Sequence, residues 1–177
     1  MTATEGTALP LQSAEMANML FAATREVFTS MLGSELQHLP ESEAERSATF
    51  DGVLSLIGLA GPVIGNGALV CTAETACDLS SRLLMSPFPH IDEEVLDAVG
   101  EIANMIIGGF KNLLEPHTGR LQMSIPSVVY GKNIATRDSK ADIAVALRCG
   151  FEGGELELKV RLVAARDWAE SRYPKKA

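Results

Sequence analysis

The sequence lacks features that several large classes of protein need. Its 177 residues carry 15 Lys and Arg against 23 Asp and Glu, a net charge of −8, whereas sequence-independent nucleic-acid binding requires clustered cations. No apolar run approaches the ~20 residues that span a bilayer. Residues 1–10 have neither the basic nor the apolar region of a signal peptide. We therefore expect a cytoplasmic protein that binds no nucleic acid and does not insert into membranes.

Cysteine, histidine and nucleotide-binding motifs are scarce as well. The three cysteines, Cys71, Cys77 and Cys149, are odd in number and lack Cys-x-x-Cys spacing, which predicts buried free thiols rather than disulfides or a metal site. The three histidines are far apart, so a zinc site built from them is disfavoured. No lysine follows Gly65-Asn66-Gly67 at Walker spacing, and no Gly-x-Gly-x-x-Gly opens a helix. We expect no cofactor of the chain's own.

The sequence does contain enough apolar material for one folded domain. The hydrophobic fraction is 46%, and this length supports one domain with a real core rather than two. Apolar spacing predicts helices at 13–32, 74–85 and 92–115, and strands at 50–59, 68–72, 121–130, 141–149 and 155–163. These elements predict an α+β fold, with a mainly antiparallel sheet of about five strands and two long helices packed beside it.

Local signals mark the expected ends of these elements. Ser13 is the expected N-cap of the first helix, and Gly33 is its stop signal. Pro116 is expected to end the long helix, and residues 65–67 are expected to form the tight turn between the first two strands. The polar, charged stretch at 34–48 predicts an exposed loop.

The most informative stretch is Asp97-Ala-Val-Gly-Glu101-Ile-Ala-Asn104, within the longest predicted helix. Because each helical residue advances about 100°, Glu101 lies about 40° from Asp97, and Asn104 lies about 20° the other way. The same stripe continues through Gly108, Lys111, Asn112 and Glu115. The opposite, core-facing side carries Leu96, Val99, Ile102, Ala103, Ile106, Phe110 and Leu113. An acid and an amide on an exposed ridge can reach into another protein's active site, although spacing alone also fits a solvated helix face.

Two glycines, Gly108 and Gly109, interrupt this helix. Each weakens local helicity by about 1 kcal/mol relative to alanine. Two such small residues allow a neighbouring backbone to approach closely, and that neighbour is either the sheet beneath or a partner protein above.

The first predicted helix contains a faint copy of the same motif. Glu15-Met-Ala-Asn18 resembles Glu101-Ile-Ala-Asn104, and Pro40 follows Asn18 at the spacing that separates Asn104 from Pro126. Leu11 stands where the copy would need an aspartate. The echo fits an αββ duplication with a degenerate first copy, and it equally fits coincidence.

The string Asp97-x3-Glu101-x2-Asn104-x21-Pro126 resembles the signature of the CheC/CheX/FliY family of chemotaxis phosphatases. Its context, GEIANMIIGG before and PSVVYG after, agrees with that resemblance. A single complete motif resembles the CheX branch most, and the proline spacer is about one residue shorter than the family pattern. The resemblance covers 13–163, a CheX-like phosphatase domain between a loose N-terminus at 1–12 and a C-terminal tail at 164–177.

The resemblance implies a CheC-like fold and a defined activity. Such proteins hydrolyse the aspartyl phosphate on the receiver domain of a CheY-type response regulator in two-component signalling. Asn104 would orient the attacking water, and Glu101 would pair with the regulator's active-site lysine. Asp97 and Gly108 would be auxiliary or partner-binding positions. The Mg²⁺ ion would sit in the regulator and not in this chain.

Two alternatives and an oligomeric state remain as hypotheses. The same fold is compatible with a non-catalytic receiver-binding adaptor or a structural module of the flagellar-switch type. An enzyme with its own pocket is disfavoured, because the sequence shows no nucleophile–base set. The resemblance to CheX implies a homodimer, and the apolar–charged alternation over 155–162 predicts a half-exposed strand that can serve as a free edge.

Overall fold

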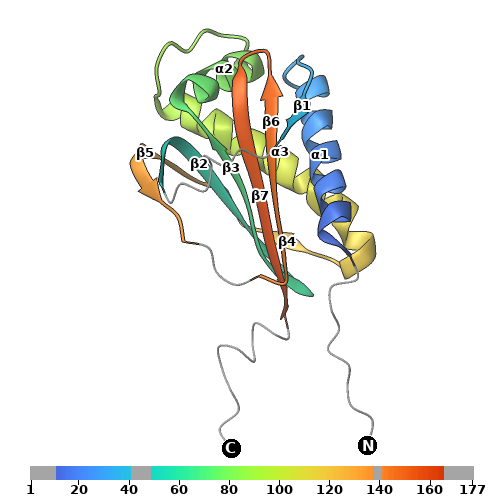
Figure 1. Ribbon diagram of the computed structural model, residues 1–177. Coiled ribbons are helices and arrows are strands. Elements are labelled where there is room, and N and C mark those ends of the chain that lie inside the picture. The colour runs from blue at the N-terminus through green and yellow to red at the C-terminus, as the bar shows by residue number, and fades with distance from the viewer. Residues whose placement is uncertain (1–10, 41–48, 138–140, 166–177) are drawn as a thin grey trace, which may run out of the picture.

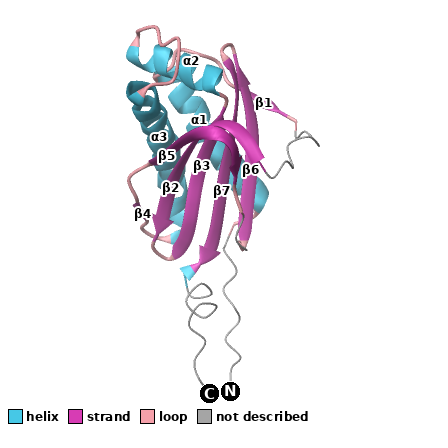
Figure 2. Ribbon diagram, turned by 90° about the vertical axis from the view of Figure 1, so that its left-hand side faces the viewer, coloured by secondary structure: helices cyan, strands magenta, loops and turns pink. Residues whose placement is uncertain are grey.

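Three helices in the described part of the chain lie on one face of a seven-stranded antiparallel sheet (Figure 1, Figure 2). The computed structural model describes residues 11–40, 49–137 and 141–165. The elements are α1 (Ser13–Ser30), β1 (Gln37–Leu39), β2 (Thr49–Ala60), β3 (Val63–Cys71), α2 (Ala73–Leu84), α3 (Glu93–Thr118), β4 (Gln122–Met123), β5 (Ser127–Ala135), β6 (Ile143–Phe151) and β7 (Gly154–Ala164). The predicted α+β class with two long helices is confirmed, and the described sheet has seven strands rather than the expected five.

The strand order is β1-β6-β7-β3-β2-β4, and β5 also pairs with β2. All of these pairs are antiparallel. The strand β7 therefore lies in the middle of the sheet, bonded to β6 on one side and β3 on the other. The prediction that residues 155–162 offer a free edge is wrong, although their alternation is correct: Leu156, Leu158, Val160 and Leu162 are all buried toward the helices.

The topology agrees with an internal duplication. Each half contains a long helix followed by three strands that pair in the same way: α1-β1-β2-β3 and α3-β5-β6-β7. The third strands of the two halves, β3 and β7, pair at the centre of the sheet. Each first strand pairs with the second strand of the other half, β1 with β6 and β5 with β2. The repeated unit is thus a helix with three strands, rather than the two that the sequence suggested, and α2 and β4 are additions to it.

The core lies between the sheet and one wide face of α3. Ten residues of this helix are buried: Val95, Ala98, Val99, Gly100, Ile102, Ala103, Ile106, Ile107, Phe110 and Leu114. Leu113, which the sequence placed in the core, is 43% exposed, and Leu114 is buried in its stead. Leu114 continues the i, i+4 series through Ile106 and Phe110, which drifts about 40° per step around the helix. Leu84, the last residue of α2, is exposed as well.

The predicted turn at residues 65–67 is wrong, because these residues lie inside β3. The β2–β3 hairpin instead turns at Gly61-Pro62, where Gly61 has a φ of +155°. A Cβ atom on Gly65 would overlap the carbonyl oxygen of Arg161 in β7, and a Cβ on Gly67 would overlap the Ile107 side chain of α3. These glycines are thus required by close packing and not by a turn.

The stretch predicted as an exposed loop at 34–48 contains β1. Ser34 and Leu36 are buried, each about 8% exposed, and residues 37–39 pair with β6. Three residues are too few to show a strand period in the sequence. At the start of α1, Gln12 and not Ser13 is the N-cap, and the Glu15 carboxylate accepts the Gln12 backbone N–H at 2.8 Å.

Pro116 lies inside α3 rather than ending it, and the helix continues to Thr118. Proline removes one helical N–H, but the carbonyl that it would have bonded belongs to Asn112, an exposed residue that water can reach. Beyond the helix, the predicted strand at 121–130 is divided into β4 and β5. Residues 1–10, 41–48 and 166–177, which include most of the predicted terminal segments, lie outside the described residues.

The side chain of Glu115 fixes the end of α3 to the start of β4. Lys111 Nζ donates to Glu115 Oε1 at 2.7 Å, and the backbone N–H of Leu121 donates to the same oxygen at 2.9 Å. The hydrogen bond from Lys111, followed by that from Leu121, holds the pKa of this carboxyl below its ordinary value of 4.5. No helix in the described ranges is long and apolar enough to cross a membrane.

We predict that Gly65→Ala destabilises the protein strongly. The added methyl group would meet the backbone of β7, which cannot rotate away, so the loss in the free energy of unfolding should lie at the upper end of the about 1–3 kcal/mol typical of overpacking. Gly131→Ala in β5 is the matched control, because its Cβ would make an ordinary 3.6 Å contact with Ile134. Urea denaturation of both variants measures the difference, and equal stabilities would contradict this packing account.

We predict that Glu115→Gln lowers thermal stability in a pH-dependent way. A carboxyl whose pKa is lowered in the folded state stabilises that state above its unfolded pKa, and this contribution is lost as the pH falls through the folded pKa. The gap in Tm between wild type and variant should therefore be largest near neutral pH and should close below about pH 4.5. Thermal melts from pH 3 to 7 measure it, with Glu26→Gln on the exposed side of α1 as control.

Candidate functional site

The face of α3 opposite its core-facing side presents the predicted motif to solvent. Asp97 and Glu101 are exposed, and Asn104 is half-buried. The helix begins where the Asp92 carboxylate accepts the Val95 N–H at 2.9 Å, a normal N-cap. Because the buried side of α3 is anchored along its length, the backbone that carries these three side chains has little freedom to rotate. The predicted stripe is therefore present as a rigid ridge.

No hydrogen bond or ion pair within the described residues involves the side chains of Asp97, Glu101 or Asn104. Neither amide atom of Asn104 is buried without a partner, so both remain open to solvent. The amide can donate through its nitrogen and accept through its oxygen, and it carries no charge. The ridge thus offers one amide and two carboxylates whose hydrogen-bonding capacity is unused within the described residues.

The rest of the predicted stripe is occupied by internal contacts. Lys111 bonds to both Asn112 and Glu115, and Glu115 holds the backbone of Leu121. These groups stabilise the end of α3 and are not available in the same way as Asp97, Glu101 and Asn104, which lie about two to five turns earlier. The stripe therefore divides into an open N-terminal half, Asp97 to Asn104, and a C-terminal half that serves the fold.

The chain between β4 and β5 runs alongside the open half of the ridge. A Cβ on Gly108 would lie 3.9 Å from the Met123 side chain, and a Cβ on Gly100 would lie 3.6 Å from Pro126 and 3.2 Å from Val128. The proline of the motif, distant in sequence, is thus brought beside the glycine that precedes Glu101. Gly109 faces α1 instead, where an added Cβ would lie 3.3 Å from the Cβ of Ala23. The close neighbour of this glycine is therefore a helix and neither of the two predicted neighbours.

The copy of the motif in α1 does not have the same environment. The carboxylate of Glu15 accepts the backbone N–H of Gln12 and so caps the start of α1. Glu101 lies in the third turn of α3, too far from the start of that helix to cap it. Leu11, at the position that corresponds to Asp97, is buried. Asn18 is exposed, as a motif residue would be. Only the copy in α3 therefore presents a complete and unengaged set of polar groups.

The environments of the three cysteines all disfavour the thiolate form. Burial raises the pKa of Cys71 to about 12 and that of Cys149 to about 11. Burial, with a smaller effect from the Asp92 carboxylate, also raises the pKa of Cys77, which is only half-buried rather than buried as predicted. All three are free thiols. A thiol with a raised pKa holds little thiolate and reacts slowly.

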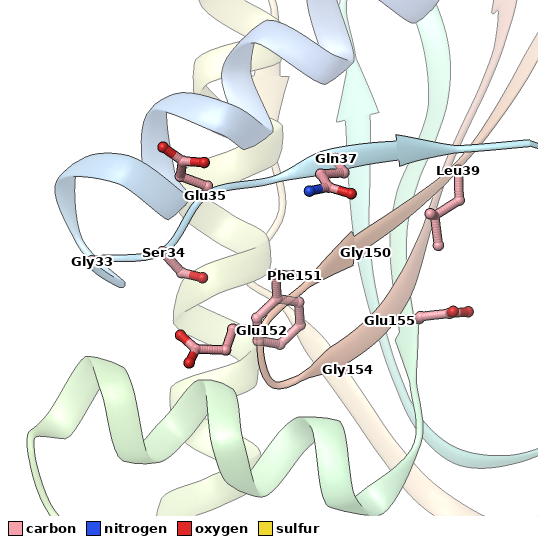
Figure 3. A pocket seen from close by; sticks show the side chains of 10 residues that line it. All are labelled: Gly33, Ser34, Glu35, Gln37, Leu39, Gly150, Phe151, Glu152, Gly154 and Glu155. Carbon is pink, nitrogen blue, oxygen red and sulfur yellow. The ribbon is translucent and has the colours of Figure 1, made fainter.

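A cavity of about 770 Å³ is lined by none of the ridge residues, and Figure 3 shows its lining. It is open and polar, and it is bounded by the end of α1, by β1 and by the β6–β7 hairpin. Three of its lining residues are acids, but the carboxylates of Glu35, Glu152 and Glu155 point in different directions in Figure 3. Glu155 is paired with Arg148, and Glu152 lies 3.9 Å from Arg82. The cavity therefore lacks a convergent set of ligands.

The described residues contain no group of three or more His, Cys, Asp or Glu side chains arranged to hold a metal ion. The imidazole of His38 packs edge-on against Phe21, with ring centroids 5.9 Å apart. His90 lines a separate cavity of about 520 Å³ beside α2, together with Ile91 and Tyr130. The ridge on α3 offers instead an exposed set of polar side chains that a second molecule can reach.

Comparison with known proteins yields one family and a consistent set of structures. Residues 53–149 match the CheX family, described as chemotaxis phosphatase CheX. The CheY-P phosphatase CheX of Thermotoga maritima is 27% identical over 123 residues, which cover 68% of this chain and 79% of that protein. The chemotaxis protein CheX from Vibrio vulnificus has the same fold, with a TM-score of 0.72, 24% identity, and coverage of 86% of this chain and 99% of that one.

A further structure with this fold is that of CheX in the CheX–CheY–BeF3–Mg²⁺ complex from Borrelia burgdorferi. It has a TM-score of 0.64 and 23% identity, and the match covers 86% of this chain and 98% of that one. The matched family segment contains both the open half of the ridge on α3 and the segment that flanks it.

Proposed function

The chain belongs to the CheX family of chemotaxis phosphatases, and from this premise we propose that it hydrolyses the aspartyl phosphate of a CheY-type response regulator. The observation that carries the proposal is the open half of the ridge, where Asp97, Glu101 and Asn104 project from a rigid helix with no internal partner among the described residues. The relative from Thermotoga maritima is named for this activity.

The chemistry needs little from the phosphatase itself. An aspartyl phosphate is a reactive acyl phosphate, so its hydrolysis depends mostly on positioning water and stabilising charge. The oxygen of water forms a bond to phosphorus as the bond from phosphorus to the aspartyl oxygen breaks. The products are the aspartate carboxylate and inorganic phosphate, and the water proton passes to phosphate or solvent. No covalent intermediate on this chain is required.

In this mechanism Asn104 orients the attacking water. An amide can accept a hydrogen bond from water while its N–H₂ donates to a phosphoryl oxygen, and it adds no negative charge beside the phosphate. A side chain held on a buried helix provides the fixed geometry that in-line attack needs. The amide of Asn104 meets these conditions, because its atoms are open to solvent while its backbone is anchored in the core.

Glu101 pairs with the active-site lysine of the receiver, one turn away from Asn104. A carboxylate bonded to an ammonium group gives a charge-assisted contact that fixes the register of the two proteins. Residues 92–110 contain five acids and no Lys, Arg or His, so this half of α3 favours a cationic partner. Asp97 adds to the negative charge of this surface as an auxiliary group. Gly108 has no side chain, so it leaves room for the partner to approach the ridge.

The Mg²⁺ ion of the reaction belongs, in this proposal, to the receiver. Aspartyl phosphates of receiver domains require a divalent cation that neutralises phosphate oxygens, and this chain supplies the opposite side of the phosphoryl group. The CheX–CheY complex from Borrelia burgdorferi contains Mg²⁺ together with BeF3, which supports a role for the ion when the two proteins are bound.

Asn104→Ala should abolish the acceleration of dephosphorylation, by roughly 100-fold or more, because the water loses its orienting group. The assay follows loss of phosphate from a phosphorylated CheY-type receiver with and without the protein. Asn18→Ala, the corresponding change in the copy on α1, is the matched control and should leave the rate unchanged. Thermal melts should place both variants close to wild type. A large drop in Tm for Asn104→Ala would assign that residue to the core and contradict the proposal.

Glu101→Lys should raise KM for the phosphorylated receiver at least about tenfold, because two like charges then face each other. The rise should weaken at high salt, since exposed charges are screened beyond about 8 Å at physiological ionic strength. Steady-state rates at two salt concentrations measure it, with Glu26→Lys on α1 as a charge-matched control. Unchanged kcat/KM would eliminate the lysine pair, and binding without faster dephosphorylation by wild type would favour the adaptor alternative.

A further inference from the structure

The segment between β4 and β5 carries an exposed apolar side chain beside the ridge. Ile125 is 85% exposed, although isoleucine is among the residues most often buried. It directly precedes the proline of the motif, yet nothing in the chemistry of dephosphorylation calls for an apolar group there. Of the described large apolar residues, only Met85, in the α2–α3 connection, is more exposed, at 92%.

Two anchor points place Ile125 at the level of Asn104. Met123 lies beside Gly108, and Pro126 lies beside Gly100, so the segment runs antiparallel to α3 between these glycines. The two helical turns from Gly100 to Gly108 span about 12 Å, and three extended residues span about 10 Å. The lengths therefore match, and Ile125 lies opposite the turn that contains Asn104.

The backbone at Ile125 is held rigidly. The neighbouring Ser124 exchanges two hydrogen bonds with Gly58 of β2: its N–H donates to the Gly58 carbonyl at 2.9 Å, and its Oγ accepts the Gly58 N–H at 2.8 Å. The same hydroxyl donates to the carbonyl of Ile125 at 2.9 Å. Pro126 then restricts φ on the other side. An exposed side chain on a fixed backbone loses little entropy when a partner buries it.

We propose that Ile125 is an apolar anchor that inserts into the surface of the phosphorylated receiver next to its aspartyl phosphate, and that it contributes to affinity rather than to the chemical step. This inference rests on the proposed function, because it takes the ridge as the interface. The partner that covers Ile125 is identified by position, because Ile125 and the ridge form one continuous surface. A protein that brings its phosphoryl group to Asn104 therefore also covers Ile125. Interfaces commonly combine such a buried apolar anchor with a polar, catalytic or charged neighbour.

The test separates affinity from rate with three uncharged substitutions. Steady-state kcat and KM are measured for wild type, Ile125→Ser, Ile125→Leu and Met31→Ser, with a CheY-type receiver phosphorylated by a small phosphodonor as substrate. Met31 is a 49%-exposed methionine at the end of α1, and α1 packs on α3 through Gly109 rather than past Gly100 and Gly108. Direct titration of the receiver gives Kd as a second readout. Thermal melts should show all four proteins equally folded, because both side chains are exposed.

The expected result is that Ile125→Ser raises KM and Kd about tenfold, in line with the loss of one buried aliphatic side chain, and leaves kcat within about twofold. Ile125→Leu and Met31→Ser should stay within about twofold of wild type in KM, Kd and kcat.

An unchanged KM, a fall in kcat alone, or an equal effect of Met31→Ser would overturn the inference. If wild type binds the receiver but does not accelerate dephosphorylation, the proposed activity fails while the Kd values still decide the role of Ile125. Absence of any binding overturns both.

Discussion

The burial of one wide face of α3 against the sheet is the constraint on which the rest of the structure depends. The helix is apolar through most of its length, and burying each Ile, Val or Phe side chain contributes about 1.5–3 kcal/mol. Its fit depends on the absence of a side chain at Gly67, where Ile107 fills the space. Once this face is buried, the rotation of the helix about its axis is determined. The direction in which Glu101 and Asn104 point is a consequence of core packing, and not of any contact that these two residues make.

This arrangement separates stability from function within one helix. The C-terminal part of α3 uses its polar side chains for the fold, as the pairing of Lys111 with Glu115 shows. The N-terminal part leaves its acids and amide without internal partners, at little cost because water satisfies exposed groups. In the first half of the chain, the residues that correspond to the motif are used for the fold. In α1 the glutamate of the motif caps the helix, and the aspartate is replaced by a buried leucine.

Long elements with strong periodic patterns were predictable, and short or exceptional ones were not. The sequence identified both long helices, the two strands β6 and β7 and the α+β class, because the apolar residues of each element follow a single period. It missed β1 and the break that separates β4 from β5, since strands of two or three residues form only where a neighbour offers hydrogen bonds. It also assigned Gly65-Asn66-Gly67 to a turn, because a glycine needed for close packing and a glycine needed for a positive φ look the same in a sequence.

The sequence by itself determined that Asp97, Glu101 and Asn104 share one side of a helix, since that depends only on the 100° step of the α-helix. It also determined the apolar face opposite them, which makes their exposure predictable. Only the tertiary structure decided which of the two motif copies is unengaged, that Pro126 lies beside Gly100, and that Ile125 is exposed on the segment between Met123 and Pro126. These facts depend on contacts between segments far apart in the chain, and the spacing of residues along one segment carries no information about them.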